Sequence, residues 1–351
     1  MQQTGIIIGH FEPLHLGHVR SILHACGQVK DLYLFVTPHP RPNPNFNINL
    51  KDKVRWLTMA FADLPFVHIE LLPDVVTPTY EDDHQAISQD KVNGVLTNLL
   101  QRFPHLTSGI EQPILFIDET HPLNQLELIV PVLSTPRHPA FNSDKIHANP
   151  ALYWSAIHPQ ARPSYTKTVA IVGGESSGKT TLLHKLVNYY GASYALEMGR
   201  VFVQTDLGGT ELGMQYDDYP LMATDHEQAI RVAKQLAPAP LTLVDTDFVT
   251  TQAFCEEYEG KTHPFLTACI DEFRLDYTIM LANNTPWVAD GMRSLGSSEQ
   301  RERFENRLKQ IFARHNIQPL FVDSPDYHQR FLQAVALIDE LIFHGYQDLT
   351  K

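Results

Sequence analysis

The sequence predicts an α/β protein built from two doubly wound parallel sheets. Short apolar runs that end in glycine, aspartate or proline alternate along the chain with longer amphipathic stretches. Unbroken apolar strands that alternate with helices are typical of parallel sheets covered on both faces. The pattern starts twice with a strand, a glycine-containing loop and a helix, at residues 4–25 and 168–190. The length of 351 residues also suits two domains of about 150 residues each.

The expected elements follow in chain order. Strands are expected at residues 6–8, 32–36, 114–117, 169–172, 194–196, 241–244, 278–281 and 320–322. Helices are expected at residues 19–25, 91–102, 180–190, 225–236, 299–314 and 327–343. Between the two starts, residues 147–167 are rich in proline and aromatic side chains, as in a linker. We therefore expect a first domain at residues 1–160 and a second at residues 161–351. A single large sheet is the alternative, but each start carries its own phosphate-loop chemistry.

The composition restricts the partners of the chain. Forty Asp and Glu residues outnumber 27 Lys and Arg residues, which leaves a formal net charge of -13. An acidic chain without a basic stripe repels the nucleic-acid backbone. The three cysteines form no CxxC motif, and no apolar run approaches the roughly 18 residues of a membrane span. We expect a cytoplasmic protein that binds neither nucleic acid nor membrane, and we leave open whether it forms a homo-oligomer.

A phosphate-binding loop opens the second domain. The stretch GGESSGKT matches GxxxxGK[ST], follows an apolar run and precedes a helical pattern, as this motif requires. In such loops the backbone amides surround the phosphates, the lysine reaches the β- and γ-phosphates, and the last hydroxyl binds Mg²⁺. We expect ATP and Mg²⁺ as ligands, with Lys179 as a catalytic cation and Thr180 as a metal ligand. The expected nucleotide-binding residues are Gly173, Gly174, Glu175, Ser176, Ser177, Gly178, Lys179, Thr180 and Thr181.

Carboxylates follow two of the expected strands. Asp245 ends the run at residues 241–244, where it can organise Mg²⁺, and Asp247 is either an alternative to it or a substrate contact. A helix cap would also explain an aspartate there. Glu197 follows residues 194–196, and strand ends line the ligand crevice of such sheets, so we expect it to be the catalytic base. Arg200 would then contact phosphate or substrate, although an i, i+3 ion pair with Glu197 is the structural alternative.

Two further segments carry candidate binding residues. Tyr216, Asp217 and Asp218 combine an aromatic ring with carboxylates, which suits a cationic aromatic substrate, although a turn before proline explains them equally well. Arg293 follows the residues Asp290-Gly291-Met292, and we expect it on a lid that closes on the triphosphate. For Arg301 and Arg303 we favour a solvated helix face with acidic partners on the same helix, Glu299, Glu302 and Glu305.

Six motifs in order resemble the ribosylnicotinamide kinase domain of NadR-type bifunctional proteins. They are GGESSGKTT, Glu197–Arg200, MQYDDYP at residues 214–220, DTDFVTTQAF at 245–254, EYEGKTHPF at 257–265 and DGMRSLGS at 290–297. The resemblance spans about residues 166–345. It implies ATP-dependent phosphorylation of the 5′-hydroxyl of nicotinamide riboside, giving nicotinamide mononucleotide (NMN). The pyridinium ring of this substrate is cationic, which suits the cluster at Tyr216.

The first domain resembles Rossmann-like nucleotidyltransferases of the adenylyltransferase type. The stretch GHFEPLHLGH, residues 9–18, contains G-x-F-x-P-x-H-x-G-H after an expected strand. His15 and His18 lie three residues apart, so both can face one site at a helix start and stabilise charge on the phosphates. The resemblance implies that this domain makes NAD from NMN and ATP. The nucleotide-binding residues are then Gly9, Phe11 and His18, the catalytic ones are His15 and His18, and Trp56 contacts substrate.

One stretch departs from the family pattern. NadR-type proteins close this domain with a motif like I-S-x-T-x-I-R, whereas residues 141–147 place Asn142, Asp144 and His147 at the Ser, Thr and Arg positions. A carboxylate there repels a triphosphate, and Lys145 compensates only in part. Two hypotheses remain: a bifunctional NAD salvage enzyme, or a monofunctional kinase whose first domain is a degenerate regulatory module that binds nucleotide. A DNA-binding repressor is disfavoured by the charge and by a signature that starts at residue 9, which leaves no room for a preceding helix-turn-helix.

Overall fold

The computed structural model describes residues 4–75, 88–107, 112–136, 141–285 and 297–343. The chain divides into two compact units, residues 1–164 and 165–351. Each contains one five-stranded sheet in which all strand pairs are parallel. The predicted fold class, two doubly wound parallel sheets, is therefore confirmed. Among the described residues, no helix has the length and apolarity needed to cross a membrane.

The sheet of the first unit has the strand order β3-β2-β1-β4-β5. Its strands are β1 (Thr4–Gly9), β2 (Asp31–Val36), β3 (Val67–Leu71), β4 (Ile114–Asp118) and β5 (Val132–Thr135). Its helices are α1 (Leu16–Cys26), α2 (Leu50–Ala60), α3 (Gln89–Arg102) and α4 (Ser143–Ala148). The central strand β1 pairs with β2 on one side and β4 on the other, so the chain reverses its direction of winding at β1. In such sheets ligands bind at the carboxyl ends of the strands beside this point.

The sheet of the second unit has the order β10-β9-β6-β8-β7, with β6 in the middle. Its strands are β6 (Lys167–Gly173), β7 (Ser193–Ala195), β8 (Leu241–Asp245), β9 (Tyr277–Leu281) and β10 (Leu320–Val322). The helices up to β8 are α5 (Lys179–Tyr190), α6 (Met198–Thr205) and α7 (Tyr219–Gln235). Those after β8 are α8 (Phe248–Glu259), α9 (Pro264–Glu272), α10 (Ser298–Arg314) and α11 (Tyr327–Ile342).

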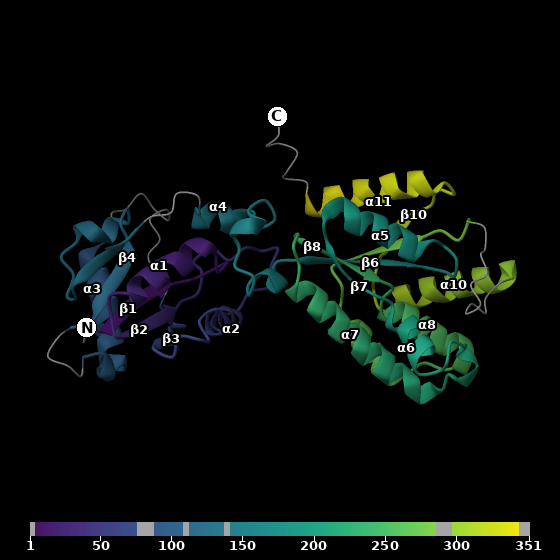
Figure 1. Ribbon diagram of the computed structural model, residues 1–351, viewed down its shortest axis with the longest axis horizontal. Helices are drawn as coiled ribbons and strands as arrows, with labels where there is room; N and C mark the ends of the chain where they lie inside the picture. The colour runs from purple at the N-terminus through teal and green to yellow at the C-terminus, as the bar shows by residue number, and fades with distance from the viewer. Residues whose placement is uncertain (1–3, 76–87, 108–111, 137–140, 286–296, 344–351) are drawn as a thin grey trace. The chain divides into compact units, whose positions relative to one another are not determined.

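Helices cover both faces of the second sheet (Figure 1). Along β6, Val169 and Ile171 belong to a core with residues of α5 and α11. The alternate residues, Ala170 and Val172, belong to a second core with residues of α7, α8, α9 and α10. Because successive side chains of a strand point to opposite faces, a strand covered on both sides must be apolar throughout. This requirement explains the unbroken apolar runs on which the fold prediction rests.

Candidate functional site

A cavity of about 340 Å³ lies in the second unit, at the carboxyl ends of β6, β7 and β8. Its lining includes residues 175–181 from the loop after β6, residues 197–200 after β7, and Thr246 after β8. Side chains of α7 and α8, among them Tyr219, Phe254 and Tyr258, complete the wall. The predicted loop, Glu197 and Arg200 thus share one cavity, although they come from separate segments.

The phosphate loop has the backbone conformation that its glycines permit. Gly173 and Gly178 have φ values of 147° and 85°, and Ser176 also lies in the left-handed region at 59°. A Cβ atom on Gly178 would approach the ring of Tyr327 to 2.9 Å, so this position accepts no larger side chain without a shift. The Lys179 ammonium donates to the carbonyls of Gly173 and Gly174 at 3.1 Å each and is thereby held over the loop.

The two aspartates considered for Mg²⁺, Asp245 and Asp247, have different hydrogen-bond partners in the structure. The Thr180 hydroxyl donates to Asp245 Oδ2 at 2.8 Å, while the buried Asp245 Oδ1 has no hydrogen-bond partner among the described residues. An unpartnered carboxylate oxygen beside a hydroxyl fits the oxygen ligands that Mg²⁺ prefers. Asp247 instead caps α8, accepting from the amide and hydroxyl of Thr250 at 2.9 Å each. Burial raises the pKa of Asp247 to about 6, and the bonds from Thr250 oppose the rise.

Glu197 stands at the start of α6 and faces the cavity. Its pKa is raised, chiefly by burial; the charge of Lys179 opposes the rise and that of Asp245 adds to it. Arg200 Nε lies 3.7 Å from Glu197 Oε2. The ion pair that was the structural alternative is therefore present, and both partners also line the cavity.

His226 on α7 is a cavity residue that sequence reasoning missed. Only 3% of its surface is exposed, and its Nε2 has no hydrogen-bond partner among the described residues. Burial lowers its pKa to about 4, against the opposing effect of the Leu196 and Thr246 backbone, so the ring is neutral at pH 7. The sequence gives no signal for it, because an isolated histidine in an amphipathic helix looks like any other core residue.

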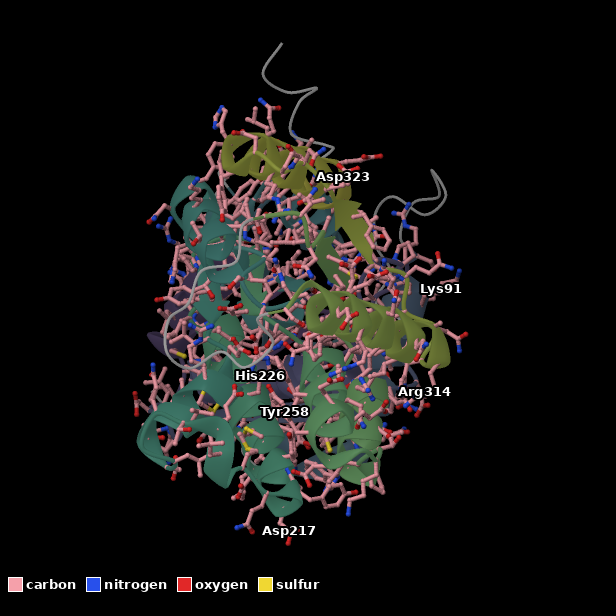
Figure 2. All side chains as sticks on the ribbon, turned by 90° about the vertical axis from the view of Figure 1, so that its right-hand side faces the viewer. Lys91, Asp217, His226, Tyr258, Arg314 and Asp323 are labelled. Carbon is pink, nitrogen blue, oxygen red and sulfur yellow. The ribbon has the colours of Figure 1, made fainter. Side chains whose placement is uncertain are left out.

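The cluster Tyr216–Asp218, the expected substrate contact, lies outside the cavity lining. The Lys261 ammonium lies 3.7 Å from the Tyr216 ring centroid, and the His263 ring is 4.3 Å away. Asp218 accepts from the Gln215 amide at 2.8 Å, as in the turn that was the alternative. Figure 2 shows Asp217 at the outer tip of this unit, pointing away from His226. The cation that stacks on Tyr216 is therefore the chain's own lysine.

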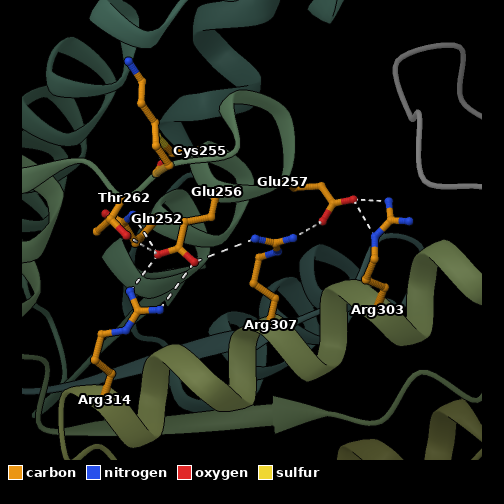
Figure 3. Close-up of polar contacts among 9 residues, drawn as sticks. Gln252, Cys255, Glu256, Glu257, Thr262, Arg303, Arg307 and Arg314 are labelled. Atoms are coloured by element: carbon orange, nitrogen blue, oxygen red, sulfur yellow. Dashed lines mark hydrogen bonds and ion pairs between the residues drawn. The ribbon is translucent and has the colours of Figure 1, made fainter.

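The predicted lid residue Arg293 lies outside the described residues. For Arg301 and Arg303 the expected solvated helix face is correct in part: Arg303 is exposed, and Glu305 and Glu299 of the same helix act electrostatically on Arg301 and Arg303, but the hydrogen bonds of both arginines go to other elements. Arg301 donates to the carbonyl of Thr285 at 3.2 and 3.3 Å. Arg303 instead pairs with Glu257 on α8, within a network that also joins Glu256, Arg307 and Arg314 (Figure 3). Arg303, Arg307 and Arg314 connect α10 to α8 because these two helices pack together, which the sequence of α10 alone does not reveal.

In the first unit, the signature residues meet after β1. His15 caps α1, its Nδ1 accepting from the amides of Gly17 and His18 at 3.0 and 3.3 Å. Because Nδ1 accepts, the ring proton is on Nε2, which lies 2.8 Å from the Ser143 hydroxyl. The rings of His15 and His18 stack at 3.6 Å, and Phe11 packs edge-on against His18 at 5.3 Å. Burial lowers the pKa of His15 to about 4 and that of His18 well below its ordinary value.

A second group of histidines surrounds the position where the family pattern has arginine. His147 on α4 places Nδ1 3.1 Å from the carbonyl of Glu12 and Nε2 2.9 Å from that of Arg41. Its ring stacks on His39 at 3.8 Å, and His39 in turn meets His10 at 4.2 Å. The pKa of His10 is lowered to about 3, first by burial and then by its cationic and histidine neighbours.

Other first-unit candidates have mixed outcomes. Gly9 lies against the Phe11 ring, where an added Cβ atom would approach to 3.3 Å. Asn142 caps α4 by accepting from the Lys145 amide at 2.9 Å, while Asp144 is exposed. Trp56, the expected substrate contact on α2, is buried and only 3% exposed.

Comparison with known proteins adds two kinds of finding. A family model described as an AAA domain matches residues 168–330. The "Trifunctional NAD biosynthesis/regulator protein NadR" of Escherichia coli (strain K12) is 37% identical over 96% of this chain and 83% of that protein. Its counterpart from Salmonella typhimurium (strain LT2) is 38% identical over 97% of this chain and 84% of that protein.

Two solved structures share the fold over nearly the whole chain. A crystal structure of NadR protein in complex with NR has a TM-score of 0.76 at 20% identity, covering 97% of this chain and 96% of that one. A crystal structure of NadR protein in complex with NAD and AMP-PNP has a TM-score of 0.73 at 21% identity, with the same coverage.

Proposed function

The chain belongs to the NadR family of NAD biosynthesis proteins, and on that premise we propose that its second unit phosphorylates nicotinamide riboside with ATP. The observation that supports this most directly is the single cavity that contains the phosphate loop and Glu197, with the Thr180–Asp245 pair at its edge. Phosphoryl transfer needs these three parts: a cradle for the phosphates, a cation site and a carboxylate that takes the hydroxyl proton.

Each residue has a defined part in this reaction. The loop amides and Lys179 bind the β- and γ-phosphates, and Arg200 contacts phosphate or substrate. Thr180 and Asp245 would hold Mg²⁺, which supplies positive charge against the phosphates when bound. Glu197 accepts the proton of the 5′-hydroxyl as that oxygen attacks the γ-phosphorus and the bond to ADP breaks. The raised pKa of Glu197 makes it a stronger base than an exposed carboxylate.

The cavity also suits the cationic ring of this substrate. Its wall combines the aromatic rings of Tyr219, Phe254 and Tyr258 with the carboxylates of Glu175 and Glu211. Aromatic faces and negative charge are the two features that attract a pyridinium. These residues take the part that the sequence assigned to Tyr216, Asp217 and Asp218.

For the first unit we propose adenylyl transfer from ATP to NMN, giving NAD. The supporting arrangement is the pair His15 and His18 at the end of the central strand, with Gly9 and Phe11 beside them. The NMN phosphate would attack the α-phosphorus of ATP in line, and the histidines would stabilise charge on the phosphates while pyrophosphate leaves.

The alternative is a monofunctional kinase whose first unit is a regulatory module. It is favoured by Asp144 and by His147, whose ring nitrogens both lie against backbone carbonyls and so do not reach out to a phosphate as arginine would.

Two assays on the full chain with ATP and MgCl₂ separate these proposals. With nicotinamide riboside we expect NMN, and with NMN we expect NAD, both followed by mass spectrometry. NAD missing from the second assay while the first succeeds selects the monofunctional kinase. NMN missing from the first assay rejects the kinase itself.

A further inference from the structure

One arginine of the second unit is buried beneath the phosphate loop. Arg330 on α11 is only 1% exposed, and its guanidinium donates to acceptors from three separate segments. They are the Ser177 carbonyl in the loop, the Ala282 carbonyl and Asn284 side chain after β9, and the Ser324 carbonyl after β10. Ser177 and Arg330 are 153 residues apart in the sequence.

The charge of Arg330 has no ion-pair partner among the described residues. Burial lowers the pKa of the guanidinium, and Tyr327 and then Asp323 act in the opposite direction. A buried cation is costly unless something compensates its charge. Backbone carbonyls compensate only part of it, so the guanidinium leaves positive potential behind the loop.

The bond to Ser177 also fixes the direction of a loop amide. In a trans peptide the C=O and the following N–H point to opposite sides. Because the Ser177 carbonyl points into the protein toward Arg330, the Gly178 N–H points to the concave side, where phosphate binds. The preceding carbonyl, that of Ser176, likewise accepts a hydrogen bond from a buried side chain, the Thr285 hydroxyl, at 3.0 Å.

We propose that Arg330 is a positioning residue of the phosphate loop: it orients the Ser177–Gly178 peptide and places a positive charge behind the triphosphate. ATP affinity then depends on a residue that touches no substrate. The proposal rests on the proposed function only in that this loop binds ATP; it does not depend on the identity of the phosphate acceptor.

The test compares Arg330→Lys with Arg314→Met in the full chain. Lysine keeps the charge but cannot reach all three segments, so we expect the KM for ATP to rise about tenfold or more, equivalent to about 1.4 kcal/mol. The KM for nicotinamide riboside should stay within about twofold, since the loop contacts phosphate. Arg314 also bonds to a neighbouring helix but lies outside the cavity lining, so Arg314→Met should leave both KM values unchanged.

Hydrogen exchange with mass spectrometry gives a readout that needs no turnover. In Arg330→Lys, faster exchange should appear in the peptide covering residues 174–181 and in the segments after β9 and β10 that share the arginine, and ATP should protect residues 174–181 less than in the wild type. Arg314→Met should not change it. Uniformly faster exchange, or wild-type exchange and ATP affinity in folded Arg330→Lys, would overturn the proposal.

Asn284→Ala is a milder variant that removes one acceptor and keeps Arg330. We expect a smaller rise in the KM for ATP, of a few-fold, and an unchanged KM would count against the proposal. If the wild type phosphorylates no nicotinamide riboside, the exchange experiment with ATP still decides the role of Arg330 separately from the proposed function.

Discussion

The strand–loop–helix at the middle of each sheet allows a direct comparison. After β6, glycines and a left-handed serine shape a loop of backbone amides, and two basic side chains, Lys179 and Arg330, donate hydrogen bonds to its carbonyls. After β1, the polar side chains at the helix start are His15 and His18, which are neutral at pH 7. The same topology thus supports two ways of binding a phosphate. One uses loop amides with lysine and arginine, and the other uses imidazoles that are charged only after taking up a proton.

Removing the loop lysine should give the largest effect. Lys179→Ala is expected to lower the kinase kcat by at least about 10³-fold, because the charge on the transferring phosphoryl group loses its cation. Formation of NAD from NMN should not change. Both rates are measured on the same preparation, and a loss of both activities would mean that the two units do not act separately.

The mirror experiment is His18→Ala. It should lower NAD formation by about 10²–10³-fold, since one donor to the phosphates is removed, and leave the kinase step intact. Retained NAD synthesis in this variant would refute the assigned role of His18.

The next effect concerns the base. Glu197→Gln should lower the kinase kcat by about 10²-fold or more, because the amide cannot accept the hydroxyl proton. In the wild type, kcat should fall as the pH decreases through the raised pKa of Glu197, above the ordinary carboxyl range. A pH profile of kcat checks both points. A variant within a few-fold of wild type, with the same acid limb, would show that Glu197 is not the base.

Acid should destabilise the first unit before the second. The pKa values of His10, His15 and His39 fall from 6.5 to about 3, 4 and 4 on folding, chiefly through burial. At pH values between 6.5 and these lowered pKa values, the unfolded chain binds more protons than the folded chain. The contribution of these histidines to the stability of the folded unit is therefore fully present above pH 6.5 and is lost as the pH falls toward 4. In the second unit His226 acts likewise, but the pKa of Asp247 rises from 3.8 to about 6 on folding, which favours the folded state as the pH falls.

Hydrogen exchange of peptides from each unit between pH 7 and 4, corrected for intrinsic rates, measures this difference. We expect protection to be lost first in residues 4–26 and 31–60. Simultaneous loss in both units would contradict the contrast between them.

The smallest effect is expected at Asp217, the exposed residue of the cluster Tyr216–Asp218. Asp217→Asn should leave the KM for nicotinamide riboside within about twofold, because Asp217 lies at the surface and outside the cavity lining. A tenfold rise in this KM would instead support Asp217 as a substrate contact, as the sequence suggested. Steady-state kinetics at saturating ATP would measure it.

In the first sheet the strength of the sequence signal follows the position of the strand, whereas in the second sheet the edge strands β7 and β10 were also predicted. The central strands β1 and β6 were predicted because a strand covered by helices must be apolar on both faces. The strands β3 and β5 were missed; they are the edges of the first sheet and most of their residues are partly or fully exposed, so their polar and apolar residues mix. The site divides in the same way. Lys179, Thr180 and Asp245 belong to local motifs, whereas His226 and Arg330 are single residues on helices.

The sequence by itself determined the two sheets, the family and the phosphate loop, because these depend on local backbone conformation and on short-range patterns of polarity. Only the tertiary structure decided which side chains face the cavity. It places the Lys261 ammonium over the Tyr216 ring, buries Trp56, and joins Arg330 to the Ser177 carbonyl, 153 residues away. Such contacts depend on how helices pack over the sheet, and packing is a property of surfaces that no single segment of the chain contains.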